Sequence, residues 1–332
     1  MKDYLTRMKE GAKIIIYDWL KIKSKDRLLI VSSNKYRLEA ELIKESARNI
    51  TDNVDIMMVE KSGKQIGVFF DENEDAFKGY NVIVGATDYS LVTTKATKKA
   101  IDNKSKFLSL PLTTTNNKSM LGYKFIKMDT KKSRLMAQII MKYIKNASVI
   151  RVTTEKGCDL KFFKRNREAG FFNGVAKDGK GYSSASFEIY VPIEENMTVG
   201  KMVVDASLGY IGKPKESITI DIKDGKIVGI EENESGLILK KYIEDFNDYR
   251  IYTAGELGIG LNSYSKCLGN CYIEDESAYG TFHIGFGRNI ALGGLCEASG
   301  HFDLVSFNPN IYADNRKIME KGRIIVPEPQ IY

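Results

Sequence analysis

Histidine is scarce in this sequence, which contains only His283 and His301 among 332 residues. Long hydrophobic runs are also missing, and the short apolar segments that are present cannot span a bilayer. The N-terminal residues are charged and lack the long apolar core of a secretory signal peptide. We therefore expect a cytoplasmic protein that does not associate with a membrane.

Blocks of one charge sign are absent as well. The net charge is +7, but lysine and arginine are interspersed with aspartate and glutamate along the whole chain. Such mixing is typical of a solvated surface, whereas a nucleic-acid-binding protein usually carries a basic patch or stripe. We expect no nucleic-acid partner.

Cysteine occurs only four times, at Cys158, Cys267, Cys271 and Cys296. Four cysteines in a chain of this length do not form the disulfide framework of small secreted domains. Cys267 and Cys271 have a spacing that could supply half a zinc site, but no second pair follows at a suitable distance. Buried or partly exposed thiols are the favoured interpretation.

The first 147 residues alternate between strand-like and helix-like patterns. Short apolar runs predict strands, and apolar residues at helical spacing or capping residues predict helices. The predicted strands cover 27–31, 54–59, 81–85 and 106–110, and the predicted helices cover 5–19, 35–49 and 131–146. This alternation indicates an α/β domain with a mostly parallel sheet, for which we set the limits 1–147.

Residues 148–332 contain many strand patterns and few helices. Asp224-Gly225 separates two alternating runs and predicts a hairpin, and a single helix is predicted over 235–246. We expect this second half to form an α+β, strand-rich domain that carries the chemistry of the protein.

Both histidines lie in the second domain, within its most glycine-rich stretch. His301 and Asp303 are two residues apart, so on a strand their side chains would share a face. Imidazole nitrogen and carboxylate oxygen suit zinc, iron, manganese or cobalt. Ordinary core or surface histidines are the alternative, but the clustering of both histidines with an aspartate favours a metal site.

Acidic residues also occur inside apolar strand patterns. Glu256 and Glu188 are the clearest cases, and a buried carboxylate is costly unless it is paired or bound to a metal. A solvent-facing strand position would equally explain Glu188. We interpret the acidic run 274–276 as a solvated loop, and Arg288 either as a group that holds a carboxylate or oxyanion or as a surface arginine.

Three segments, in this order, resemble the thermophilic-type aminopeptidases, that is, the aminopeptidase T and aminopeptidase S metallopeptidases. They are Gly255-Glu-Leu-Gly-Ile-Gly-Leu-Asn262, Asp275-Glu276 leading to Gly280-Thr-Phe-His283, and His301-Phe-Asp-Leu-Val305. The resemblance implies an α/β N-terminal domain, a C-terminal metal-binding domain and a homodimer. It also implies a dinuclear metal site, bridged by Glu256, whose ligands are Glu188, Glu256, His283, His301 and Asp303.

On this resemblance we expect a metal-dependent aminopeptidase that removes N-terminal residues from peptides with a metal-activated water. One or two divalent ions (zinc, cobalt or manganese) would be the cofactor, and a small peptide or another small molecule would be the substrate. Glu256 and Arg288 would be the catalytic residues. The family has a tyrosine seven residues after the first histidine, where this chain has Ile290, so weak or narrow activity is expected.

A related branch of the same superfamily, the 2,5-dihydroxypyridine dioxygenases, implies another reaction. Its members hold one iron with two histidines and an aspartate, a set that is present here as His283, His301 and Asp303. The alternative function is therefore a mononuclear non-haem Fe(II) dioxygenase acting on a small aromatic ring. A biosynthetic or accessory homologue without peptidase turnover is the third possibility, which the missing tyrosine favours.

Overall fold

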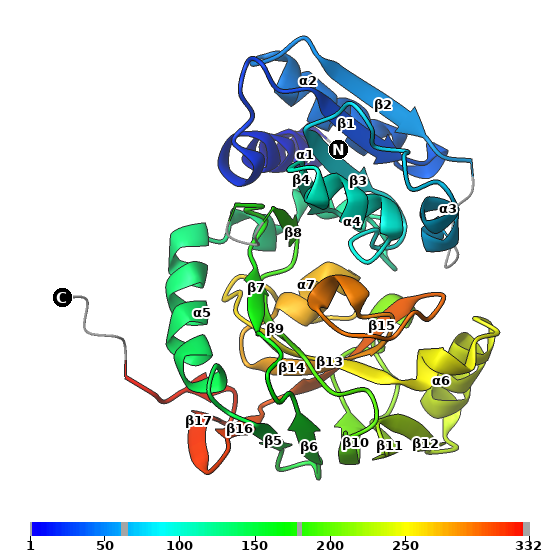
Figure 1. Ribbon diagram of the computed structural model, residues 1–332, viewed down its shortest axis with the longest axis vertical. Helices are drawn as coiled ribbons and strands as arrows, with labels where there is room; N and C mark the ends of the chain where they lie inside the picture. The colour runs from blue at the N-terminus through cyan, green and yellow to red at the C-terminus, as the bar shows by residue number, and fades with distance from the viewer. Residues whose placement is uncertain (1, 61–65, 178–180, 328–332) are drawn as a thin grey trace. The chain divides into compact units, whose positions relative to one another are not determined.

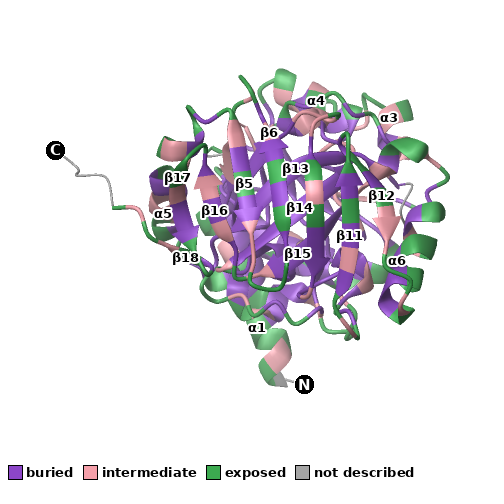
Figure 2. Cartoon of the chain, turned by 90° about the horizontal axis from the view of Figure 1, so that it is seen from below, coloured by how far each residue is buried: buried purple, intermediate pink, exposed green. Residues whose placement is uncertain are grey.

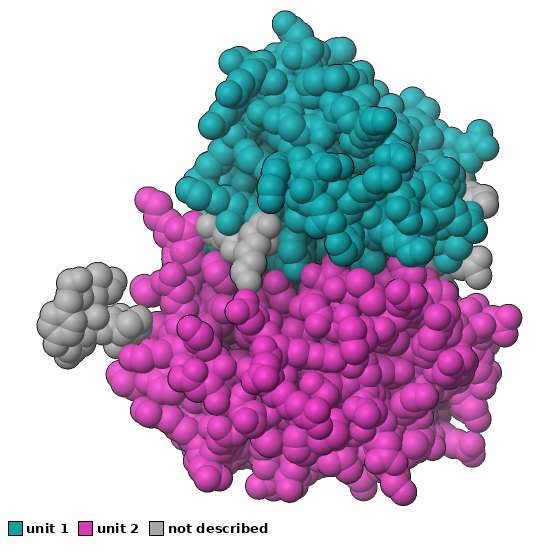
Figure 3. All heavy atoms as spheres, viewed as in Figure 1, with its two compact units in different colours: residues 1–130, 172–186 teal, residues 131–171, 187–332 magenta. Residues whose placement is uncertain are grey.

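The computed structural model describes residues 2–60, 66–177 and 181–327, and the chain divides into two compact units. One unit comprises residues 1–130 and 172–186, and the other comprises residues 131–171 and 187–332 (Figure 3). The domain boundary near residue 147 stays a prediction. None of the described helices is long and apolar enough to cross a membrane.

The first unit contains a sheet in which every pairing is parallel. Its strands lie in the order β2 (Val54–Met58), β1 (Leu28–Ser32), β3 (Val82–Ala86), β4 (Lys106–Ser109) and β8 (Tyr182–Ser184). Every residue of β1 and β3 is buried, which explains why these strands are continuous apolar runs rather than alternating ones. The prediction of an α/β domain with a mostly parallel sheet is confirmed.

The helix α1 (Lys2–Ile14), which continues as a π-helical turn over Ile15–Leu20, precedes the first strand of this unit. Three helices, α2 (Arg37–Arg48), α3 (Ile66–Glu72) and α4 (Lys95–Asp102), connect its successive strands. The helix α5 (Thr130–Ile144) follows along the chain and lies in the second unit from residue 131 onward. The sequence predicted α1, α2 and α5 but missed the two short helices. In α4 the buried positions are only Ala96, Thr97 and Ala100, which give too weak an apolar pattern to be recognised.

The second unit contains two sheets whose strands pair antiparallel (Figure 1). The larger sheet has the order β12 (Lys226–Ile230), β11 (Ile218–Lys223), β10 (Val199–Val204), β6 (Asp159–Phe163), β5 (Val149–Thr153), β16 (Asn310–Ala313), β17 (Arg316–Glu320) and β18 (Arg323–Ile324). Buried and more exposed residues alternate along β5, β6 and β11 (Figure 2), as expected for a sheet with one covered face. The predicted hairpin forms between β11 and β12, with positive φ at Asp224 and Gly225.

The smaller sheet of this unit is the one that carries the predicted site. Its strands lie in the order β15 (His301–Phe307), β14 (Thr281–Gly287), β13 (Ala254–Gly260), β9 (Glu188–Pro192) and β7 (Gly170–Phe172). Every residue of β9, β13 and β14 is buried. The helix α7 (Tyr272–Ser277) packs against β13, β14 and β15, while α6 (Glu234–Glu244) packs against β11 (Figure 1). The expected strand-rich α+β domain is confirmed.

A side-chain clip holds the chain just before β15. The carboxylate of Asp248 accepts hydrogen bonds from the guanidinium of Arg250 at 2.9 and 3.0 Å and from the backbone N–H of Ser299 at 2.7 Å. Burial alone would raise the pKa of Asp248, but these hydrogen bonds outweigh it and lower the pKa to about 2. Because Ser299 lies two residues before His301, the clip helps to fix the start of the strand that carries this histidine.

The Asp248→Asn change should lower the free energy of unfolding at pH 7 by about 1 to 2 kcal/mol, because hydrogen bonds to a charged group are lost. Since the folded-state pKa is depressed, the contribution is fully present above the unfolded pKa of roughly 3.9 and is lost as the pH falls toward 2. Urea unfolding of both proteins between pH 7 and pH 2 measures this, and the difference between the two stabilities should shrink below pH 4. A stability difference that is constant over this range would contradict the prediction.

Candidate metal centre

Strand register brings the five predicted metal-site residues to neighbouring positions of the smaller sheet. On β13 and β14, Glu256 is paired with Gly285 and Gly258 is paired with His283. Gly285 is in turn paired with Asp303 on β15. Directly paired residues, and residues two apart on one strand, point to the same face of a sheet. The site is therefore built by the alternation of histidine, carboxylate and glycine on adjacent strands.

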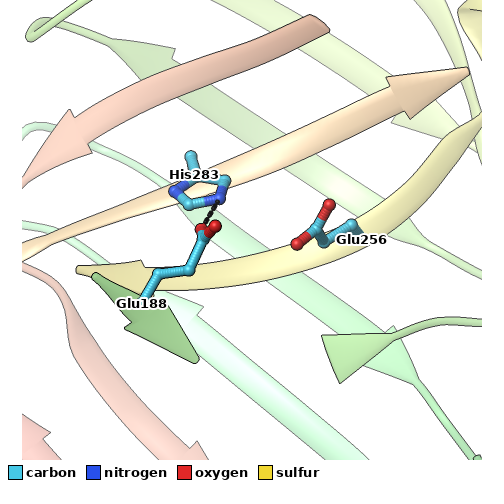
Figure 4. A group of neighbouring side chains, drawn as sticks. All are labelled: Glu188, Glu256 and His283. Atoms are coloured by element: carbon cyan, nitrogen blue, oxygen red, sulfur yellow. Dashed lines mark ion pairs between the residues drawn. The ribbon is translucent and has the colours of Figure 1, made fainter. Parts of the chain in front are cut away.

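The ligand atoms form two groups that share one residue. The candidate ligand atoms of Glu188, Glu256 and His283 (Figure 4) all lie within 4.8 Å of one another, and so do those of Glu256, His301 and Asp303. In the first group Nε2 of His283 lies 2.8 Å from Oε2 of Glu188. In the second group Nε2 of His301 lies 3.2 Å from Oδ1 of Asp303 and 3.4 Å from Oε2 of Glu256. Glu256 thus joins the two groups.

Two glycines leave the space into which these side chains converge. A Cβ atom added at Gly285 would lie 2.6 Å from Cε1 of His301 and 2.9 Å from Oδ1 of Asp303. A Cβ added at Gly258 would overlap the imidazole ring of His283. These contacts are closer than real side chains tolerate, so both positions require glycine for a packing reason rather than for its backbone freedom.

Burial and mutual repulsion shift the acid–base behaviour of the site. Burial, together with the charge of Glu188, raises the pKa of Glu256 to about 8. Burial would lower the pKa values of His283 and His301, but the neighbouring carboxylates raise both to about 9. Burial would raise the pKa of Asp303, but the neighbouring imidazole of His301 lowers it to about 2. Several carboxylates are therefore crowded into a buried space, where a cation relieves their repulsion.

The donor atoms fit a divalent metal ion. Among the described residues, Nδ1 of His283 and Oδ1 of Asp303 are buried atoms without a hydrogen-bond partner. Buried polar atoms are normally paired, so an unpaired carboxylate oxygen of Asp303 in a group with His301 and Glu256 suits a divalent metal ion. The expectation of residues that can hold a divalent ion is confirmed, while the assignment of each residue as a ligand stays a prediction.

A backbone carbonyl orients the second histidine. Nδ1 of His301 lies 2.9 Å from the carbonyl oxygen of Arg288, so the neutral imidazole would donate through Nδ1 and keep a lone pair on Nε2 for a metal. The Arg288 side chain donates from Nε to the carbonyl of Ala298 at 2.7 Å. The structure thus places the main chain of Arg288 beside the site, and a catalytic role for its side chain stays a prediction.

The acidic run after Cys271 is not the solvated loop that the sequence suggested. It forms the buried helix α7, in which Glu274, Asp275 and Glu276 are at most 6% exposed. Asp275 accepts hydrogen bonds from the hydroxyl of Ser207 at 2.8 Å and from the N–H of Gly269 at 3.0 Å, which offsets its burial. Burial and the nearby charge of Glu188 hold the pKa of Glu276 well above its usual range.

Tyr272, on the same helix, is a site residue that sequence reasoning missed. Its hydroxyl donates a hydrogen bond to Oδ2 of Asp303. The signal in the sequence is the spacing of four residues between Tyr272 and Glu276, which on a helix places both side chains on one face. The cysteines, in contrast, are free and buried as favoured, and no metal-compatible group in the described parts of the chain contains one.

A family model for 2,5-dihydroxypyridine 5,6-dioxygenase matches residues 7–326. The chain belongs to this dioxygenase family. A 2,5-dihydroxypyridine 5,6-dioxygenase of Pseudomonas putida is 27% identical over 146 residues, which make up 40% of this chain and 41% of that protein. The match therefore spans less than half the length of this relative.

Two solved structures show the same fold. The 2,5-dihydroxypyridine dioxygenase from Pseudomonas putida KT2440 is similar with a TM-score of 0.79 and 17% identity, over 97% of each chain. Wild-type AmpT from Thermus thermophilus is similar with a TM-score of 0.64 and 12% identity, over 97% of this chain and 100% of that one. At these identities the likeness concerns the fold alone.

The prediction of an aminopeptidase is wrong, because the family model and the named relative both belong to the dioxygenase branch. The expectations of a hydrolase and of zinc fall with it, while the expectation of an enzyme is confirmed. The error has a physical reason: histidine and carboxylate ligands in the same order along a common fold are compatible with both reactions. The missing tyrosine at Ile290 was the feature of the sequence that pointed away from the peptidases.

The Gly285→Ala change should weaken metal binding by about tenfold to a hundredfold, because the added methyl group displaces His301 or Asp303. Titration of chelator-treated protein with ferrous or cobaltous ion, followed by calorimetry, measures the effect. Gly67→Ala on α3 is the matched control, since its added Cβ would meet no atom closer than 3.8 Å. Wild-type affinity in a folded Gly285→Ala protein would show that this glycine does not shape the site.

Proposed function

We propose that this protein is a metal-dependent dioxygenase that opens a small hydroxylated aromatic ring, with a dihydroxypyridine as the first candidate. The observation that carries the proposal is the convergence of the partly buried His301 with the buried His283, Glu256, Glu188 and Asp303 on one sheet. Membership of the dioxygenase family and the name of the Pseudomonas putida relative support the reaction type. A small-molecule substrate is part of the same proposal.

The cofactor in this proposal is a ferrous ion. Two histidines and one carboxylate are the donor set typical of non-haem iron. His301 and Asp303 lie in one group with Glu256, and His283 lies in the other group with Glu256. Bound there, the ion would supply the redox chemistry with dioxygen, which no amino-acid side chain of the site supplies. If His283 and Glu188 both act as ligands, a second ion would bind in their group. If they stay paired with each other, one ion would bind, between His301, Asp303 and Glu256.

The side chains of the site have clear roles around such an ion. His301 is held by the carbonyl of Arg288, so its ring presents Nε2 toward Glu256 and Asp303. Oε2 of Glu188 lies 2.8 Å from Nε2 of His283 and so holds the orientation of that ring. Burial of these residues excludes water, which strengthens electrostatic interactions with a bound ring and protects it from side reactions.

Dioxygen uptake tests the proposed reaction. Protein loaded anaerobically with ferrous ion should consume dioxygen when 2,5-dihydroxypyridine is added, with an equimolar loss of the ring absorbance. A chelator should abolish both signals, and catechol and hydroquinone serve as ring controls. Unblocked amino-acid amides should not be cleaved. If protein shown to contain iron consumes no dioxygen with any hydroxylated ring, the proposed reaction is refuted.

Glu256→Gln should weaken the binding of every ion by about a hundredfold, because Glu256 belongs to both ligand groups. Glu188→Gln is the matched comparison, because it belongs only to the group of His283 and should spare an ion held by His301 and Asp303. Elemental analysis and calorimetric titration give the number of ions and their affinities. Unchanged affinity in Glu256→Gln would remove this residue from the centre.

The homodimer expected from the sequence stays a prediction. Size-exclusion chromatography with light scattering would test it, and its outcome does not affect the metal centre, because all five candidate ligands come from one chain.

A further inference from the structure

The two carboxylate oxygens of Asp303 have different surroundings. Oδ1 lies 3.2 Å from Nε2 of His301 and at the space that Gly285 leaves open. It makes no hydrogen bond within the described residues. Oδ2, in contrast, accepts the hydrogen bond from the hydroxyl of Tyr272. Only Oδ1 is therefore available to an ion held between Asp303, His301 and Glu256.

The ring of Tyr272 is buried and fixed by its neighbours. It stacks on the ring of Tyr210, with centroids 4.0 Å apart and an angle of 13° between the planes. Tyr210 belongs to a 3-10 turn that starts at Gly209, where a Cβ would lie 2.6 Å from the carbonyl oxygen of Asp303. This turn, and the tyrosine stacked on it, are therefore packed directly against the strand that carries Asp303.

The helix of Tyr272 is also held in place. Asp275, three residues further along α7, is bound by the hydroxyl of Ser207 and by the N–H of Gly269. Ser207 is itself bridged to Val305 of β15 by backbone hydrogen bonds in both directions. The hydroxyl of Tyr272 thus reaches Asp303 from a frame that is attached to the same strand, and it has little freedom to follow the carboxylate if that group rotates.

We propose that Tyr272 is a positioning residue that restricts Asp303 to binding a metal through one oxygen. A carboxylate that binds through both oxygens takes two coordination positions, whereas Asp303 with Oδ2 tied to Tyr272 takes one. The position left open would be free for substrate. The inference rests on the metal centre of the proposed function, but it concerns a residue outside the candidate ligand set.

Cobaltous ion is the probe for this role, because its visible absorption spectrum changes with coordination number and it needs no dioxygen. Tyr272→Phe keeps the stacked ring and removes only the hydroxyl. It should bind cobaltous ion about tenfold to a hundredfold more weakly, the usual cost of losing a partner of a metal ligand, and should alter the visible spectrum. Tyr210→Phe is the matched control, since it removes a hydroxyl from the same stack without touching the bond to Asp303.

A double-mutant cycle then shows whether Tyr272 acts through Asp303. Tyr272→Phe should have no further effect on cobalt affinity in an Asp303→Ala background. Three results would each overturn the inference. They are an additive loss of cobalt affinity in the double mutant, an equal loss of cobalt affinity in Tyr210→Phe, and an unchanged affinity and spectrum in folded Tyr272→Phe. If the wild-type protein binds cobaltous ion but its iron-loaded form consumes no dioxygen, only the proposed reaction is refuted. If the wild-type protein binds no ion, the metal centre and this inference are both refuted.

Discussion

The burial of several carboxylates beside two imidazoles is the constraint on which the second unit depends. Glu188, Glu256 and Asp303 are each at most 4% exposed, and the strands that carry Glu188 and Glu256 are buried at every residue. Charges removed from water are costly, and like charges in one buried space repel each other. The two histidines compensate in part, which is why their pKa values rise to about 9 despite burial. A divalent cation would complete the compensation, and the nitrogen and oxygen donors that converge on this sheet fit one.

The main chain and the uncharged residues around these side chains serve that same constraint. Glycine at 258 and 285 keeps the space between the strands open, and a carbonyl from Arg288 sets the orientation of His301. The strand that carries His301 and Asp303 is held at its start by the Asp248 clip, and its middle is bridged to Ser207. None of these groups belongs to the candidate ligand set. They act by fixing where the donor atoms lie, and metal affinity is sensitive to such outer contacts almost as much as to the ligands themselves.

Part of this arrangement could be read from the sequence. The spacing of His301 and Asp303, together with the scarcity of histidine, was sufficient to predict that these two side chains lie close together on one face of a strand, because strand alternation is a local property. The buried apolar runs of β1 and β3 were recognisable for the same reason. The bond from Tyr272 to Asp303 was not, since it joins residues 31 positions apart through the packing of a helix on a strand. The acidic run was misread because polar composition suggests solvent, whereas hydrogen bonds from Ser207 and Gly269 allow Asp275 to be buried.

The reaction was the hardest property to infer, because imidazole and carboxylate ligands do not by themselves choose between hydrolysis and oxygenation. Both need an ion with an open position, and the choice depends on the redox properties of that ion and on the groups beside the substrate. Hydrolysis through a tetrahedral intermediate benefits from a hydrogen-bond donor to the developing oxyanion. At the position where the aminopeptidases carry a tyrosine, Ile290 has no such donor. The lack of a donor at Ile290 therefore argues against peptidase chemistry, whereas the types of the candidate ligands are compatible with either reaction.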